Sequence, residues 1–258
     1  MITADARAGA AARRAARERF VRARRAETSY ARQLARIARH VGDIVRGIAP
    51  GGEVDMGRRV AIERAMAAYA DLLRPWANAV GHHMLVDVSR RDEQAWIEAG
   101  REMGRNLRDV IAGAPVGAVM RERLAEQVHL ITSLPREAAQ RVHHLAVEAQ
   151  INGTRAAQIS EEILRSGDVT RSRAMTIART EVARSVGALT EARAVHVGSE
   201  GYIWRTSRDS DVRESHREME GRYVRWDTMP TLSDGTKCHA GGIYNCRCWS
   251  EPVIPDDF

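Results

Sequence analysis

The chain has 258 residues, of which 44% are hydrophobic and 29% are charged, and its formal net charge is +6. This hydrophobic fraction excludes a chain that is disordered throughout. No apolar run approaches the 18 residues of a membrane span, and the first residues lack the pattern of a secretory signal. We therefore expect a soluble protein that is made in the cytoplasm and has no membrane partner.

The positive charge is concentrated near the N-terminus, because residues 1–50 hold twelve arginines and only four acidic residues. Residues 1–28 are rich in arginine and alanine, with almost nothing to bury, which predicts a solvated helix or a disordered basic arm. Arginine suits phosphate, although a GC-rich genome would also enrich it. The candidate DNA-binding residues are Arg13, Arg14, Arg17, Arg22, Arg24 and Arg25.

A helical domain is predicted for residues 29–114. Apolar residues recur there at steps of three and four, which places them on one face of a helix: Tyr30, Leu34, Ile37, Val41, Ile44 and Ile48. A second helical tract is predicted from about residue 55 to 111, with interruptions at Pro75 and Ser89. Residues 112–115 (Ala-Gly-Ala-Pro) form the expected domain boundary.

Further helices are predicted at 115–132, 135–151 and 155–166, followed by a long helix that Thr170 caps and Gly198 ends. Strands follow at 202–206, 222–226 and 246–253, with a short helix at 211–221. The expected fold class is therefore mainly α with a small C-terminal α+β domain, in which long helices precede a short-stranded antiparallel sheet.

An ordered set of motifs in residues 128–253 resembles the phage Mu F-like head-morphogenesis family. The residues that carry the resemblance are Ala178, Arg179, Thr180, Glu181, Trp204, Asp209, Arg213, His216, Gly221, His239 and the run Asn245, Cys246, Arg247, Cys248. Cys238 departs from the family pattern as an extra cysteine before His239. We assign residues 115–258 to this Mu F-like domain.

The resemblance implies a structural minor capsid protein of a tailed bacteriophage rather than an enzyme. Such a protein lies in the virion, inside the capsid near the portal vertex, and assists head assembly, DNA packaging or DNA delivery. Its implied partners are the portal protein, packaged double-stranded DNA, and major capsid or scaffold proteins. Residues 29–114 are the candidate portal-docking region. The alternatives are a metal-dependent nuclease, which Asp209, His216 and His239 loosely suggest, and a general DNA-binding module.

The three cysteines and His239 all lie within residues 237–248. Cys246 and Cys248 are two apart on a predicted strand, so their side chains share one face, as a pair of metal ligands requires. Cys238 and His239 are adjacent and face opposite ways, so only one of them joins the pair. His216, His239, Cys246 and Cys248 are the candidate zinc ligands, with Cys238 as the alternative to His239.

Two other interpretations of this cluster stay open. The cysteines could be reduced, buried thiols, with His216 hydrogen-bonded to Asp209 or to a backbone carbonyl, or two of them could form a disulfide.

Consecutive helical residues diverge, so Arg179, Thr180 and Glu181 cannot act together on one substrate atom. We expect Arg179 or Glu181 to form a buried ion pair with the terminal sheet, with Arg213 as the partner. Trp204 and Trp226 are expected in the core. The residues assigned to this structural motif are Arg179, Glu181, Trp204, Asp209 and Arg213.

Overall fold

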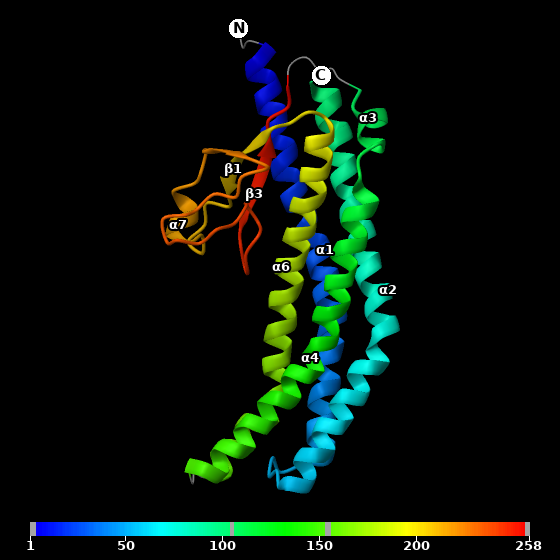
Figure 1. Ribbon diagram of the computed structural model, residues 1–258, viewed down its shortest axis with the longest axis vertical. Coiled ribbons are helices and arrows are strands. Elements are labelled where there is room, and N and C mark those ends of the chain that lie inside the picture. Colours follow the sequence, from blue (N-terminus) through cyan, green and yellow to red (C-terminus); the bar gives the residue numbers. More distant parts are fainter. Residues whose placement is uncertain (1–3, 104–105, 153–155, 256–258) are drawn as a thin grey trace. The chain divides into compact units, whose positions relative to one another are not determined.

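The computed structural model describes residues 4–103, 106–152 and 156–255 (Figure 1). Long helices come first in the chain and a small antiparallel sheet comes last, which confirms the predicted fold class. The elements are α1 (Ala4–Ile48), α2 (Met56–Glu102), α3 (Arg108–Ala112), α4 (Val116–Asn152), α5 (Ala156–Leu164), α6 (Ser166–His196), β1 (Gly201–Thr206), α7 (Glu214–Arg217), β2 (Tyr223–Arg225) and β3 (Cys248–Pro252).

The chain forms two compact units, each assembled from separate segments. The first holds Met1–Glu27, His83–Arg123 and Arg179–Phe258, and the second holds Thr28–His82 and Leu124–Ala178. Neither unit is a continuous stretch of the chain, because α1, α2, α4 and α6 each contribute residues to both units.

The second unit is helical and has an apolar core. The first part of the predicted stripe on α1 is buried there, with Leu34, Ile37 and Val41 at 1% exposure or less, while Ile44 and Ile48 are partly buried. The Tyr30 hydroxyl donates a hydrogen bond of 2.8 Å to Gln127 of α4. Gly42 of α1 and Gly167 of α6 let the two helices approach closely, because a Cβ added at Gly167 would lie 3.1 Å from the Gly42 Cα.

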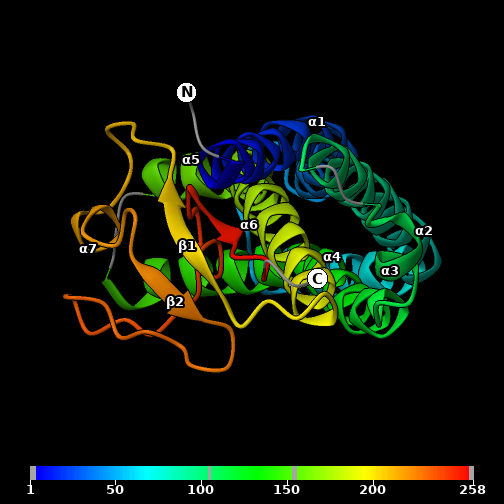
Figure 2. The ribbon, with the colours of Figure 1, turned by 90° about the horizontal axis from the view of Figure 1, so that it is seen from above.

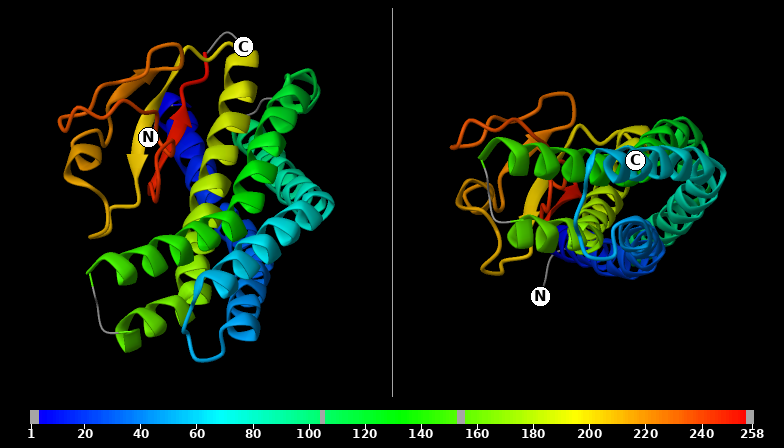
Figure 3. Two further views of the ribbon diagram at one scale, coloured as in Figure 1. Left: turned by 60° about the horizontal axis from the view of Figure 1, so that its bottom comes forward. Right: turned by 90° about the horizontal axis from the view of Figure 1, so that it is seen from below.

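The first unit contains the sheet, whose strand order is β2-β1-β3 with antiparallel pairing throughout (Figure 2). β1 and β3 lie between α7 and the C-terminal half of α6, residues 179–196 (Figure 3). The core of this unit gathers side chains from α2, α3, α6 and the sheet, including Trp96, Ile111, Tyr202, Trp204 and Trp226. Trp204 and Trp226 are therefore in the core, as expected.

Two prolines that were predicted to end helices lie inside them. α2 continues through Pro75 and Ser89, and α4 continues through Pro135. Pro75 is exposed, as is Asp71, whose carbonyl loses its helical donor, so water can replace that hydrogen bond.

Near Pro135, the hydroxyl groups of Thr132 and Ser133 donate to carbonyls of the preceding turn, at Val128, His129 and Leu130. Pro135 removes the donor to a different carbonyl, that of Ile131 four residues earlier. The predicted breaks at Pro75, Ser89 and residues 133–135 are wrong, since α2 and α4 are continuous through these positions.

The start of α6 also differs from the prediction. The helix begins at Ser166, and Thr170 lies inside it, where its hydroxyl donates to the Ser166 carbonyl at 2.7 Å. A threonine whose hydroxyl donates to the carbonyl four residues earlier lies inside the helix and is not its N-cap. The predicted break at residues 152–154 lies largely outside the described residues.

The basic N-terminal segment is helical from residue 4 and contributes to the core. Ala16, Ala23 and Ala26 on α1 are buried. Alanine side chains therefore pack in the interior of this segment, for which the sequence predicts almost no buried residues. The Phe20 ring stacks on Trp249 of β3, with ring centroids 4.6 Å apart. No helix in the described part of the chain carries an apolar stretch long enough to cross a membrane.

Candidate metal centre

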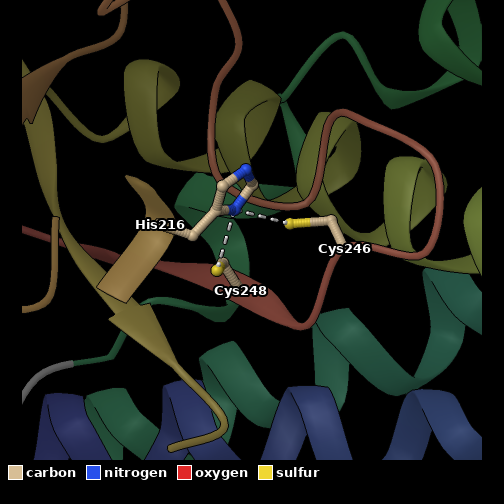
Figure 4. A group of neighbouring side chains, drawn as sticks. All are labelled: His216, Cys246 and Cys248. Carbon is tan, nitrogen blue, oxygen red and sulfur yellow. Dashed lines mark hydrogen bonds between the residues drawn. The ribbon is translucent and has the colours of Figure 1, made fainter. Parts of the chain in front are cut away.

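His216, Cys246 and Cys248 meet in the interior of the first unit (Figure 4). His216 comes from α7, Cys246 from the turn before β3, and Cys248 is the first residue of β3. Their ligand atoms all lie within 4.8 Å of one another, and each residue is at least 96% buried. The His216 Nδ1 lies 3.4 Å from the Cys248 Sγ and 3.5 Å from the Cys246 Sγ.

The turn that carries Cys246 depends on two unusual backbone conformations. Asn245 has a φ of 54°, which asparagine tolerates better than most residues. Gly241 has a φ of 82°, and a Cβ there would lie 3.3 Å from the Cys248 carbonyl oxygen. Cys246 therefore lies in a turn and not on the strand predicted from residue 246, yet its sulfur still lies beside that of Cys248.

Helix α6 anchors this turn through the motif that contains Thr180 and Glu181. The Asn245 N–H donates to the Thr180 hydroxyl at 3.2 Å. Arg184 donates from Nε to the Gly242 carbonyl at 2.8 Å and from Nη1 to Glu181 at 2.9 Å. The Glu181 side chain is 1% exposed, and Arg123 lies 3.9 Å from its other oxygen.

The ion pair expected between this motif and Arg213 is replaced by other contacts. Glu181 pairs with Arg184 and Arg123, Arg179 pairs with Glu27 at 3.3 Å, and Arg213 donates to the Tyr244 carbonyl at 3.0 Å. Sequence reasoning missed Arg184, although its position three residues after Glu181 on a helix was the available signal.

The turn has a second anchor on the side of Asp209. Arg247 donates to Asp209 at 2.6 Å and lies 2.9 Å from Asp211. The hydrogen bond from Arg247 is the main reason that the pKa of Asp209 falls below its ordinary value. Asp209 is therefore engaged with Arg247 and does not orient His216.

Trp204 of β1 supports the imidazole of His216, since the two rings meet edge to face with centroids 5.5 Å apart. The His216 Nε2 is buried and finds no hydrogen-bond partner among the described residues. Nδ1 is thus the nitrogen of this ring that has polar neighbours, and both of those neighbours are sulfur atoms.

The thiols of Cys246 and Cys248 differ in their pKa because each acts on the other. A hydrogen bond from Cys248, assisted by His216, lowers the pKa of Cys246 to about 4 despite burial. The same hydrogen bond, together with burial, raises the pKa of Cys248. Cys246 is therefore the first of the pair to become a thiolate, the form of cysteine that binds metals.

Cys238 and His239 occupy different surroundings, as their alternation predicted. Cys238 is 4% exposed and packs in the same apolar cluster as Cys246 and Cys248, and burial raises its pKa to about 11. His239 is only partly buried, its Nδ1 lies 3.1 Å from the Tyr202 hydroxyl, and burial lowers its pKa.

The residues that suggested a nuclease lie in three separate clusters. Asp209 contacts Arg247, His239 contacts Tyr202, and His216 contacts the two cysteines. All three cysteines have free thiols.

The candidate DNA-binding arginines lie on α1. Five of them are exposed, namely Arg13, Arg14, Arg17, Arg24 and Arg25. Arg22 is partly buried and lies 2.7 Å from both Glu18 and Glu98, while Arg14 lies 3.6 Å from Glu102. The exposed face of this segment is thus positively charged, and its opposite face packs through alanines.

Comparison with known proteins identifies the segment that contains the cluster. Residues 140–251 match the family model described as "Phage Mu protein F like protein". The chain is also 30% identical, over 175 residues, to a Haemophilus influenzae protein described as "Uncharacterized protein". That match covers 66% of this chain but 38% of the relative, so the chain spans less than half of the relative's length. No solved structure gives a significant match.

The match of residues 140–251 contains His216, Cys238, Cys246 and Cys248, together with the anchoring residues of α6. Through these residues, segment 140–251 of the chain is similar to the phage Mu F-like family.

Proposed function

We propose that this protein is a structural minor capsid protein that takes part in phage head morphogenesis. The observation that carries the proposal is the Mu F-like match over residues 140–251. Within the head, the protein associates with the portal inside the procapsid and assists assembly, DNA packaging or DNA delivery. Its role is that of a binding and assembly component rather than an enzyme.

The portal contact belongs to the helical region of residues 29–114. In that region Leu72 on α2 is a large apolar residue that is 78% exposed. Long helices with exposed apolar positions suit docking to another helical or grooved surface. Leu72 is therefore the first position at which a charged substitution should weaken portal binding.

Co-expression with the portal protein of the same phage, followed by size-exclusion chromatography, tests this association. We expect the two proteins to elute together in mild salt, and the Leu72→Asp variant to elute separately. Arg90→Ala on the same helix, which removes only an exposed ion pair with Asp87, serves as the control and should keep the complex. Separate elution of the unaltered protein would contradict the proposed portal association.

The exposed arginines of α1 support a contact with packaged DNA. Arginine binds phosphate through parallel hydrogen bonds, and a contact made mainly to phosphates carries no sequence preference. Arg13, Arg17 and Arg25 are exposed on this segment. They are the most direct residues to test, because their guanidinium groups face solvent.

The DNA test compares two triple variants that lose the same charge. The first variant replaces Arg13, Arg17 and Arg25 by alanine. The second replaces three exposed arginines outside α1 by alanine, namely Arg90, Arg217 and Arg225. These three pair with Asp87, Glu214 and Asp227, respectively. If each α1 arginine contacts one phosphate, the first triple should lower the slope of log K against log salt by about 2.7. The second should leave that slope nearly unchanged, and equal effects of both would contradict a DNA contact on α1.

A further inference from the structure

The cluster of His216, Cys246 and Cys248 brings three potential metal ligands close together. One ring nitrogen lies almost equally far from two sulfurs, at 3.4 Å and 3.5 Å. A single N–H can point at only one acceptor with good angles. One well-aligned hydrogen bond therefore accounts for one of the two nitrogen–sulfur contacts and leaves the second contact unexplained. A metal ion between the three atoms accounts for both.

The distances agree with tetrahedral zinc. With Zn–S of about 2.3 Å and Zn–N of about 2.1 Å, a tetrahedral angle separates nitrogen from sulfur by about 3.6 Å and sulfur from sulfur by about 3.8 Å. The two nitrogen–sulfur distances lie within a few tenths of an ångström of that value, and the three atoms all lie within 4.8 Å of one another. Small side-chain rotations therefore suffice to bind the ion.

The donor set points to zinc in preference to the harder cations. Soft thiolate ligands combined with imidazole suit zinc, whereas calcium and magnesium take oxygen ligands. The three residues are almost completely buried, and their side chains converge from α7, from the turn before β3 and from β3 itself (Figure 4). A buried site without carboxylates is typical of a structural metal.

The fourth ligand follows from the surroundings of residues 238 and 239. Cys238 is buried within the same apolar cluster as Cys246 and Cys248, but its sulfur is not among the ligand atoms that lie within 4.8 Å of one another, so zinc binding requires it to move toward them. The His239 Nδ1 is instead engaged with the Tyr202 hydroxyl at 3.1 Å. This choice replaces the sequence-based preference for His239.

We propose that the chain binds one Zn²⁺ through His216, Cys238, Cys246 and Cys248. The ion joins α7, the loop that begins at Cys238, and β3, so it stabilises the small sheet region as a unit. Four protein ligands leave no open coordination position, so the site is structural and not catalytic. This proposal is independent of the role in the phage head, because the site could bind zinc in a chain with any function.

The first experiment measures bound metal in the purified, untagged chain by elemental analysis under reducing conditions. We expect close to one zinc per chain. His216→Ala, Cys246→Ser and Cys248→Ser should each lose most of this zinc, and Cys238→Ser should lower zinc affinity by at least tenfold. His239→Ala is the matched control, one residue away, and should keep the metal.

The second experiment uses the unaltered chain, which avoids variants that fail to fold. Removal of zinc by a chelator, followed by addition of cobalt(II), should produce the absorption bands of tetrahedral cobalt and sulfur-to-cobalt charge transfer. In Cys238→Ser the charge-transfer intensity should fall by about one third, as three thiolates become two.

Absence of zinc from the unaltered chain, together with absence of tetrahedral cobalt bands, would overturn the site. Loss of zinc in His239→Ala with retention in Cys238→Ser would overturn the assignment of the fourth ligand. Neither result bears on portal association, so failure of the metal proposal and failure of the proposed function are separate outcomes.

Discussion

Replacement of Glu181 by alanine should destabilise the first unit and loosen the turn that carries Cys246. The Glu181 side chain is 1% exposed and accepts from Arg184 at 2.9 Å, with Arg123 at 3.9 Å. Arg184 in turn donates to the Gly242 carbonyl at 2.8 Å. The substitution therefore removes the group that fixes Arg184 in position to bond the turn.

The expected cost follows from these contacts. Loss of a charge-assisted hydrogen bond costs about 1.5–3 kcal/mol, and removal of one partner from a buried ion pair costs about 3–5 kcal/mol. Arg184 and Arg123 keep 23% and 17% of their side-chain surface in water, so both remain partly hydrated after the change. We therefore expect a loss of about 2–4 kcal/mol, below the figure for a fully buried pair.

Urea unfolding followed by tryptophan fluorescence measures this loss, since Trp96, Trp204, Trp226 and Trp249 all belong to the first unit. Hydrogen exchange in residues 240–246 should rise in the same variant, because the turn loses an anchor. Glu181→Gln, which keeps the shape and one acceptor, should cost less than Glu181→Ala.

The control is Glu200→Ala, which removes an exposed contact with Arg225 at 3.5 Å in the same unit. It should cost less than about 1 kcal/mol. The reasoning is refuted if Glu181→Ala unfolds at the same urea concentration as Glu200→Ala and leaves exchange in residues 240–246 unchanged.

Three further predictions concern the same unit. Asp92→Ala leaves Arg193, which is 3% exposed, without its carboxylate, and should cost about 3–5 kcal/mol in urea unfolding, against less than about 1 kcal/mol for Arg90→Ala. Burial raises the pKa of Glu191. The folded protein therefore loses stability as pH rises from the ordinary carboxyl pKa through the raised pKa of Glu191. Glu191→Gln removes this titration and should flatten that part of the curve of stability against pH. Asn245→Ala should cost about 1–2 kcal/mol and Asn245→Gly much less, because φ is 54°, and equal melting temperatures for the two would contradict this.

Local sequence pattern was sufficient to predict the helices and strands, but not where a helix continues. The apolar spacing of α1 identified its buried face, and the short strands were placed within a few residues. Pro75 and Pro135 were misjudged because the effect of a proline depends on what satisfies the freed carbonyls. At Pro75, exposure lets water replace the lost hydrogen bond, and this cannot be derived from the proline alone.

The candidate metal centre was predictable in part. We predict that His216, Cys246 and Cys248 lie together, from the spacing of the two cysteines and the position of His216 on the preceding helix. In the structure their ligand atoms lie within 4.8 Å of one another. The alternation of Cys238 and His239 predicts that only one of them joins the pair, and our proposal of Cys238 depends on Tyr202, which lies more than thirty residues earlier. Arg123 and Phe20 were not predicted, because their contacts join segments that are distant in the sequence.

The strand order β2-β1-β3 has a consequence for synthesis of the chain. The middle strand is made first, and its last partner, Pro252, follows Thr206 by 46 residues. At roughly 5–20 residues per second, the ribosome needs roughly 2–9 s to supply that partner. β2 is made within this interval, so the β1 edge that β3 covers stays open longest and can pair with a neighbouring nascent chain. Strand exchange between copies is therefore limited by translation speed, and not by the stability of the finished sheet.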